Sequence, residues 1–324
     1  MPSPAFLTRR AVLRSTGLLA GAALVQRYTP GVLAAQAPAP STKAGVDALN
    51  ARRADMAKIP IARTRLADRL ELLAGPGGNV LVLHGPDGLL LVDTFVRPAW
   101  PALKTTLAAI GGATATVVDT HWHYDHADNN ASLHGAGATI VAHVNTKKRL
   151  SEPHDIIGLH MEPEPADALP AVTFTDTHAL RANGEAIALQ HVPPAHTDTD
   201  ITVRFAKANV LHLGDLFFNG SYPFIDPVTG GRMDGMIAAA GEALKTVDAQ
   251  TQIVPGHGPL GDRAALERYR AMLVKVRDRV GALKASGKSL AETLAAKPSA
   301  EFDAEWGTGF MKPDAFVGVV YATL

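Results

Sequence analysis

Four candidate metal ligands lie within six consecutive residues of this sequence, His121-Trp122-His123-Tyr124-Asp125-His126. They follow an apolar run, 114–119, that is typical of a buried strand. His121 and His123 can face one position from an extended turn. Asp125 and His126 can face a second position as the next helix begins. Three imidazoles and a carboxylate suit zinc or iron far better than calcium or magnesium.

Three other segments each place a candidate ligand beside a predicted strand. His196 lies in a loop between two such strands, and Asp215 and His257 follow the strands predicted at 209–213 and 252–254. Taken singly these residues are weak evidence, because loop histidines are usually exposed and aspartate is a common turn residue. The glycines on both sides of His257 allow its backbone to approach a site closely.

The composition limits the chemistry that the chain can perform. Its 324 residues include 31 Lys+Arg, 31 Asp+Glu, 13 His and no Cys. The absence of Cys excludes disulfides, thiolate zinc sites, iron–sulfur clusters and a cysteine nucleophile. The neutral charge balance provides no basic field for nucleic acid. We therefore expect no nucleic-acid partner, and metal ligands drawn from His, Asp and Glu.

The first 37 residues are predicted to be an export signal. Arg9 and Arg10 precede an uncharged apolar run, 15–25, and Ala35-Gln36-Ala37 has the small residues of a signal-peptidase site. The run is shorter than the roughly 20 residues that a membrane span needs. The segment resembles a twin-arginine export signal. We expect a periplasmic or secreted protein without a stable membrane anchor after cleavage; the alternatives are an uncleaved membrane anchor or a basic amphipathic helix.

The rest of the chain is predicted to form a layered α/β fold. Residues 38–58 are expected to be a linker or N-terminal extension, and 59–324 one domain that carries all the candidate ligands. Residues 289–324 are predicted to form several short helices. Segment 151–170, which contains several prolines, is predicted to be a long loop, and its part 153–170 is a candidate lid. Strands are predicted at 79–84, 88–92, 114–119, 138–142, 186–192, 201–205, 209–213 and 252–254, and helices at 101–110, 144–150, 233–247 and 263–283.

Taken together, the ligand segments resemble the metallo-β-lactamase fold superfamily over roughly residues 70–260. Its HxHxDH motif is matched in full by 121–126. The resemblance implies an αββα sandwich with a two-metal site at one edge, to which this chain adds C-terminal helices. It also divides the ligands between two ions: His121, His123 and His196 for the first, Asp125, His126 and His257 for the second, and Asp215 bridging both.

Asp93 is a further candidate site residue. It closes the run Leu-Val-Asp-Thr, where the resemblance implies an acidic residue that orients a ligand histidine through its free ring nitrogen. Asp93 would equally suit an ordinary turn at the end of a strand.

The resemblance implies a hydrolase that holds two Zn²⁺, with iron or manganese as other candidates. A metal-bridging hydroxide would attack an ester, thioester, lactone or amide bond of a small-molecule substrate. Asp125 would orient the hydroxide and pass a proton to the leaving group. β-Lactamases of this fold generally carry Cys or Ser where Asp215 stands, so the residue favours other hydrolases. The alternatives are a mononuclear iron persulfide dioxygenase-like enzyme, β-lactamase activity, or a non-enzymatic periplasmic metal-binding protein.

Aromatic residues crowd the segment that follows Asp215. Phe217, Phe218, Tyr222 and Phe224 lie there in a chain that is only 6% aromatic. Phe218 and Tyr222 are the candidate substrate contacts, within an apolar wall where Tyr222 could donate to a substrate carbonyl. The alternative is that these rings pack as ordinary core.

Overall fold

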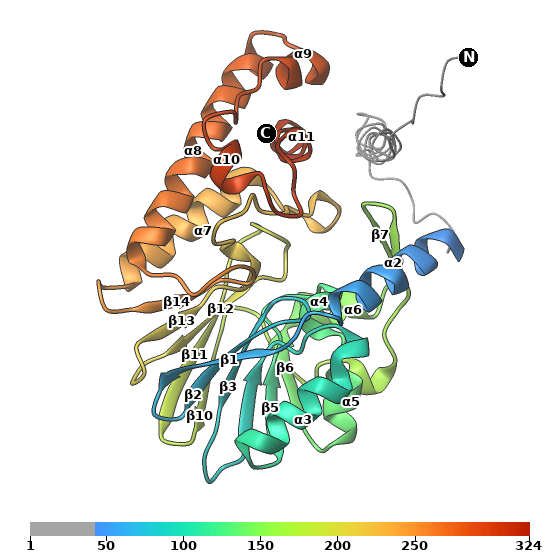
Figure 1. Cartoon of the computed structure of the whole chain (residues 1–324), viewed down its shortest axis with the longest axis vertical. Coiled ribbons are helices and arrows are strands. Elements are labelled where there is room, and N and C mark those ends of the chain that lie inside the picture. Colours follow the sequence, from blue (N-terminus) through green and yellow to red (C-terminus); the bar gives the residue numbers. More distant parts are fainter. Residues whose placement is uncertain (1–42) are drawn as a thin grey trace, which may run out of the picture.

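The computed structural model describes residues 43–324. The predicted export signal, 1–37, lies outside the described residues, and so does the start of the predicted extension, 38–58. The remainder of that extension contains helix α2 (Lys43–Met56). This helix packs beside a small hairpin formed by β7 (His154–Ile156) and β8 (Leu159–Met161) (Figure 1).

That hairpin lies within the segment predicted to be an irregular excursion. Its turn, Ile157-Gly158, has two positive φ angles, 48° and 81°, as a two-residue turn between twisted antiparallel strands requires. Each of its strands has only three residues. Alternation over three residues is too short to predict a strand, so the sequence indicated only a loop.

The first sheet has seven strands in the order β1-β2-β3-β4-β5-β6-β9. The strands β1 to β4 pair antiparallel, and the remaining pairs are parallel. All four residues of β4 are buried, as expected for a strand covered on both faces. The strands are β1 (Ala62–Ala67), β2 (Leu70–Ala74), β3 (Asn79–Leu83), β4 (Leu89–Val92), β5 (Thr114–Val118), β6 (Thr139–His143) and β9 (Val172–Phe174).

The second sheet has five strands in the order β10-β11-β12-β13-β14. Burial alternates along β11, which is the pattern of a strand with one face toward the core. Only the pair β13–β14 is parallel. The strands are β10 (Thr177–Ala182), β11 (Glu185–His191), β12 (Ile201–Phe205), β13 (Val210–His212) and β14 (Gln252–Val254).

The two sheets pack face to face around a shared apolar core. Leu81 and Leu83 of the first sheet belong to the same buried cluster as Leu189, Val203 and Phe205 of the second. Burying both inner faces in one cluster is the main stabilising contact of a β-sandwich.

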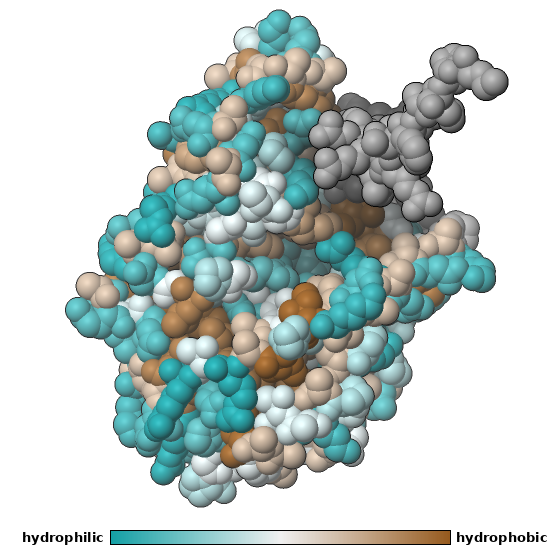
Figure 2. All heavy atoms as spheres, in the orientation of Figure 1, coloured by the Kyte–Doolittle hydropathy of each residue, from teal (hydrophilic) through white to brown (hydrophobic). Residues whose placement is uncertain are grey.

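Helices cover both outer faces of this sandwich (Figure 1). Leu103 and Leu107 of α3 (Trp100–Ile110) join a buried cluster with residues of the first sheet. On the other side, α7 (Met233–Thr246), α8 (Arg263–Ala285) and α11 (Pro313–Thr323) share a cluster with the second sheet. Figure 2 shows hydrophilic residues over much of the outward surface of these C-terminal helices. The predicted layered αββα fold with extra C-terminal helices is confirmed.

Short helices complete the described part of the chain: α4 (Tyr124–Ala127), α5 (Asn130–Gly135), α6 (Val144–Leu150), α9 (Leu290–Ala295) and α10 (Asp303–Trp306). Together with α11, the last two bear out the prediction of a C-terminal region that is helical in pieces. Within residues 43–324, no helix combines the length and apolar character that crossing a membrane requires.

Candidate metal centre

The candidate ligands converge because the segments that carry them leave the sheets near one another. The HxHxDH motif follows β5 and runs into α4, while His196 lies between β11 and β12. Asp215 and His257 follow β13 and β14, which are parallel neighbours and so end at the same edge. The structure brings all seven predicted ligands together in two groups.

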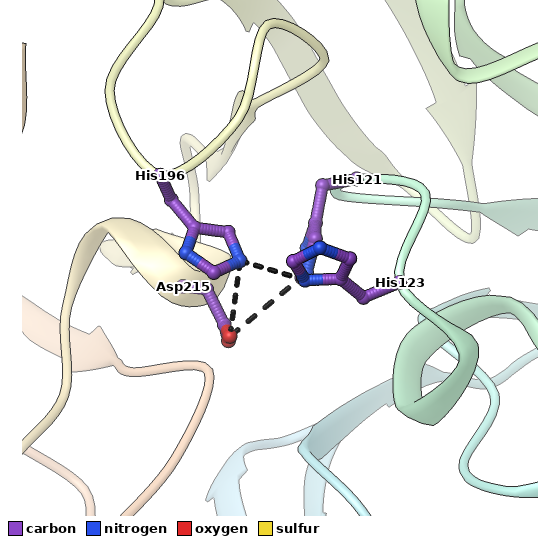
Figure 3. A group of neighbouring side chains, drawn as sticks. All are labelled: His121, His123, His196 and Asp215. Atoms are coloured by element: carbon purple, nitrogen blue, oxygen red, sulfur yellow. Dashed lines mark hydrogen bonds and ion pairs between the residues drawn. The ribbon is translucent and has the colours of Figure 1, made fainter. Parts of the chain in front are cut away.

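The first group contains three imidazoles and a carboxylate, from His121, His123, His196 and Asp215 (Figure 3). One ligand atom from each lies within 4.8 Å of the others. His196 Nε2 is 2.9 Å from His123 Nδ1 and 3.4 Å from Asp215 Oδ2. His121 Nε2 is 3.9 Å from the same carboxylate oxygen. All four residues are buried, so their ligand atoms face one another rather than bulk water.

The second group contains Asp125, His126 and His257, again with ligand atoms within 4.8 Å of one another. His257 Nε2 lies 3.3 Å from His126 Nε2 and 3.4 Å from Asp125 Oδ2. The side chains of Asp125 and His257 are 14% and 25% exposed. This group therefore forms the more open side of the centre.

Asp215 lies between the two groups. Its Oδ2 is near His196 and His121, as described above, whereas its Oδ1 is 3.2 Å from His126 Nε2 and 3.4 Å from His257 Nε2. A carboxylate whose two oxygens face two sets of nitrogen ligands is suited to bridge two cations.

The donor set fits divalent zinc. His121 Nε2 is buried and, among the described residues, has no hydrogen-bond partner. Leaving buried polar atoms unsatisfied is costly, and metal coordination removes that cost. Imidazole and carboxylate ligands without thiolates also suit iron or manganese.

Asp93 orients one of the ligands. Its Oδ2 lies 2.7 Å from His126 Nδ1, so that ring presents Nε2 to the centre. The Thr120 backbone N–H donates to Asp93 Oδ1 at 2.8 Å, and the Thr120 hydroxyl donates to Oδ2 at 2.9 Å. The structure therefore places Asp93 where a carboxylate fixes the orientation of a ligand histidine.

Asp226 performs the same task for His123 and was not predicted from the sequence. Its Oδ2 lies 3.3 Å from His123 Nε2 and also accepts a hydrogen bond from the Thr229 hydroxyl. The Val228 backbone N–H donates to the other oxygen at 2.9 Å. The only sequence signal was an Asp-Pro pair, which is common in turns.

Two further contacts orient the remaining rings of the first group. His196 Nδ1 lies 2.8 Å from the Phe224 carbonyl oxygen. His121 Nδ1 lies 3.0 Å from the Thr120 hydroxyl, whose own proton goes to Asp93. In both rings, Nε2 is thereby left for a metal.

Burial keeps two of the imidazoles neutral. Desolvation, with the neighbouring His126, holds the pKa of His121 well below its usual range. Desolvation also lowers the pKa of His196 to about 4, although Asp215 opposes the shift. Neutral imidazole is the form that binds metal, so these two rings are ready to act as ligands at neutral pH.

The second group is more strongly charged. Burial would lower the pKa of His257, but Asp215 and Asp125 raise it to about 9. Burial would raise the pKa of Asp215, but His257 and His126 hold it well below its usual range. A metal entering this group therefore competes with a proton on His257.

A cavity of about 300 Å³ opens beside the centre. Phe218 and Phe224 line it, as does Ile156 of the β7–β8 hairpin. Tyr222 also lines it, but its hydroxyl donates to Asp303 at 2.8 Å, which leaves no proton for a substrate carbonyl. Phe217 is fully buried against Tyr269. The aromatic segment therefore serves partly as cavity wall and partly as core.

Comparison with known proteins supports the assignment of the fold. A family model described as the metallo-beta-lactamase superfamily matches residues 74–278. No curated protein sequence matches the chain. A metallo-beta-lactamase from Pontibacter korlensis is 17% identical, with a TM-score of 0.55 over 66% of this chain and 98% of that one. The DIM-1 metallo-beta-lactamase is 20% identical, with a TM-score of 0.54 over 66% and 98% of the two chains.

A protein with different chemistry shares the fold. The stereoselective inverting sec-alkylsulfatase Pisa1 from Pseudomonas sp. is 16% identical, with a TM-score of 0.60. The match covers 81% of this chain and 50% of the sulfatase. At these identities the likeness shows the fold and leaves the reaction open. The family model spans well over half of the chain, and all seven candidate ligands lie within the residues it matches; the chain belongs to the metallo-β-lactamase superfamily.

Proposed function

We propose that this protein is an exported di-zinc hydrolase that cleaves an ester, thioester, lactone or amide bond of a small molecule. The observation that carries the proposal is the position of Asp215 between two groups of ligands, with one oxygen toward each. A single-ion site would not need both groups.

The proposed roles are metal binding for the seven candidate ligands and ligand orientation for Asp93 and Asp226. His121, His123 and His196 would hold one zinc ion, and the second group would hold the other, with Asp215 shared. Bound zinc would supply a water of lowered pKa as nucleophile and a Lewis acid for the substrate carbonyl. Asp93 and Asp226 keep His126 and His123 in the orientation that such ligation requires.

Asp125 is the proposed proton-transfer residue. It lines the cavity and lies 3.4 Å from His257. Burial would raise the pKa of Asp125, but His126 and His257 hold it below its usual range, so the group is ionised. An ionised carboxylate at the cavity can orient a water, accept its proton and deliver that proton to the leaving group.

The proposed location follows from the N-terminal sequence. The Arg9-Arg10 pair, the apolar run and the small residues at 35–37 support twin-arginine export to the periplasm or beyond. The proposed partner is a small-molecule substrate, for which the cavity beside the centre has a suitable size.

Metal analysis combined with a substrate panel tests the proposal. We expect two zinc ions per chain, and turnover of at least one ester, thioester, lactone or amide that a chelator abolishes and zinc restores. The double variant His121→Ala/His123→Ala should lose both the first ion and the activity. Full activity in that variant, or iron as the only stoichiometric metal together with oxygen consumption, would overturn it. Penicillin and cephalosporin arms of the panel determine whether β-lactams are among the amides cleaved.

A further inference from the structure

We infer that Arg52 recognises an anionic group on the substrate, at a position separate from the bond that is cleaved. The inference rests on the proposed function and adds a substrate class to it. The substrate would be a small apolar ester or amide that carries a free carboxylate or similar oxyanion. Arg52 would act as a specificity-determining residue.

Arg52 provides the only Arg or Lys side chain among the described residues that line the cavity. It comes from α2, whereas the ligands that share the cavity come from the sheet edges. Among residues 43–324 it forms no ion pair with any carboxylate, in contrast to its neighbour Arg53, whose guanidinium is paired with Asp128. A cation without a carboxylate partner beside a substrate cavity is available to a ligand anion.

The guanidinium is held in place by contacts that leave one edge free. Its Nε donates to the Tyr124 hydroxyl at 2.8 Å, and its Cζ lies 4.0 Å from the centroid of the Phe310 ring. Neither contact uses the edge formed by the two terminal nitrogens. Because that edge can bind an oxyanion through two parallel hydrogen bonds, a fixed guanidinium is well suited to carboxylate recognition.

Tyr124 connects this cation to the metal centre. It stands in the HxHxDH motif between His123 and Asp125, one ligand of each group. The hydroxyl that accepts from Arg52 is therefore on the same short segment as the catalytic carboxylate. This arrangement sets the anion-binding edge at a fixed place relative to the reacting centre.

The remaining wall of the cavity suits the body of such a substrate. Leu159 and Met161 of the hairpin face it, together with Phe218, Phe224 and Phe310. Apolar walls with a few placed polar groups are typical of small-molecule sites, in which the polar groups determine orientation. An apolar body with one charged end would place its anion at Arg52 and its ester or amide bond at the metal centre.

Two phenyl esters with the same six-carbon acyl chain provide a kinetic test: phenyl hydrogen adipate, which carries a free carboxylate, and methyl phenyl adipate, in which that carboxylate is a methyl ester. Hydrolysis of the phenyl ester breaks the acyl–oxygen bond in both. Water supplies oxygen to the acyl group and a proton to the phenol that leaves. The zinc-loaded protein should prefer the anionic ester, measured as the ratio of the two kcat/KM values.

Arg52→Met should lower that ratio by about ten- to a hundredfold, which is the usual range for losing hydrogen bonds to a charged group. Methionine keeps a long stem against Phe310, so the change removes charge more than packing. Arg52→Lys should retain part of the preference, and Phe310→Leu should give an intermediate loss. Arg65→Met is the matched control: Arg65 is exposed on β1 and pairs with Asp68, so its replacement should leave the ratio unchanged.

Binding measurements separate this inference from the proposed hydrolase activity. Calorimetry would compare 6-phenylhexanoate with the neutral 6-phenylhexanamide on zinc-loaded wild type and Arg52→Met. Any carboxylate affinity due to zinc is common to both proteins, so the difference between them reports Arg52. A preference that depends on Arg52 without turnover of any substrate would support the inference and contradict the proposed function. A preference in Arg52→Met within twofold of wild type, in binding and in kcat/KM, would overturn the inference.

Discussion

The residues of the HxHxDH motif could be identified from the sequence as candidate metal ligands because the motif is local. His121 to His126 are neighbours along the chain, so their proximity does not depend on the rest of the fold. Asp226 offered no such signal, since it approaches His123 only after more than a hundred intervening residues have folded. Its importance comes entirely from the ring nitrogen that it contacts.

Asp226→Ala should weaken zinc binding by the first group. Without the carboxylate, the His123 ring is free to turn and presents Nδ1 to the metal for less of the time. Loss of such a supporting group typically lowers metal affinity by about ten- to a hundredfold. Chelator competition on the purified protein measures the change. Asp68→Ala is the control, because the Asp68 side chain is 85% exposed and pairs only with Arg65. Equal zinc affinity in the two variants would show that Asp226 does not support the site.

Gly256→Ala should disrupt the centre from the backbone side. A Cβ at this position would overlap Asp215 Oδ1 and lie 2.7 Å from the Gly214 carbonyl carbon. Since backbone cannot yield easily, we expect loss of stoichiometric zinc and destabilisation by about 2 kcal/mol or more. Metal analysis and urea unfolding measure the two effects. Gly281→Ala, near the C-terminal end of α8 with only Leu324 at 3.8 Å, should instead be neutral or stabilise by about 0.5–1 kcal/mol.

At the scale of elements, some predictions matched the structure residue for residue. The strand predicted at 201–205 and the helix at 144–150 have those bounds in the structure. Strand β1 was missed because four of its six residues are exposed and polar or small. Helix α2 was missed because only Gly45, Leu49 and Arg53 of its residues are buried. One buried leucine, Leu49, packs with Trp122 and Met161 of the domain, and the buried Arg53–Asp128 pair adds a second attachment.

Arg53→Ala should weaken the attachment of α2 to the wall of the cavity. Arg53 donates to both oxygens of Asp128, whose side chain is 1% exposed. Removing one partner of a buried pair costs about 3 kcal/mol or more; Arg97 also contacts Asp128, so we expect a loss near that lower bound. Urea unfolding measures the loss, and limited proteolysis should cut within 43–56. Lys58→Ala, which breaks an exposed pair with Asp55, should change stability by less than about 1 kcal/mol; equal losses in both variants would contradict a structural role for the buried pair.

At the scale of the whole molecule, the two sheets create a site whose charge depends on its metal. In the metal-free protein, Asp215 and Asp125 raise the pKa of His257 to about 9, above its ordinary 6.5, despite burial. A raised pKa in the folded state stabilises the protein fully below the ordinary value, and the contribution is lost as pH rises through the folded value.

The free energy of unfolding of the metal-free protein should therefore fall between about pH 6.5 and 9, by on the order of 3 kcal/mol from His257. Urea unfolding with a chelator present measures it. His257→Asn should make the fall smaller without abolishing it, because Asp215 and Asp93 also raise the pKa of His126 well above its ordinary value despite burial. With zinc in place of the proton, the fall should disappear. Zinc binding at pH 7 should also release protons, which calorimetry in buffers of different ionisation enthalpy would detect. Zinc uptake without proton release would contradict a protonated His257.

Local sequence was sufficient to predict the layered fold, the motif at 121–126 and the strand ends that carry His196, Asp215 and His257. Periodicity and ligand spacing are properties of neighbouring residues, so they can be read along the chain. The pairing of β13 with β14, the support of His123 by Asp226 and the approach of Arg52 to the cavity could not be read in this way. Each joins segments that are distant in sequence, and burial and hydrogen bonding act only once the two sheets have packed. Whether an aspartate is a turn former or a support for a ligand, and whether an arginine is a surface charge or an anion site, is set by that packing.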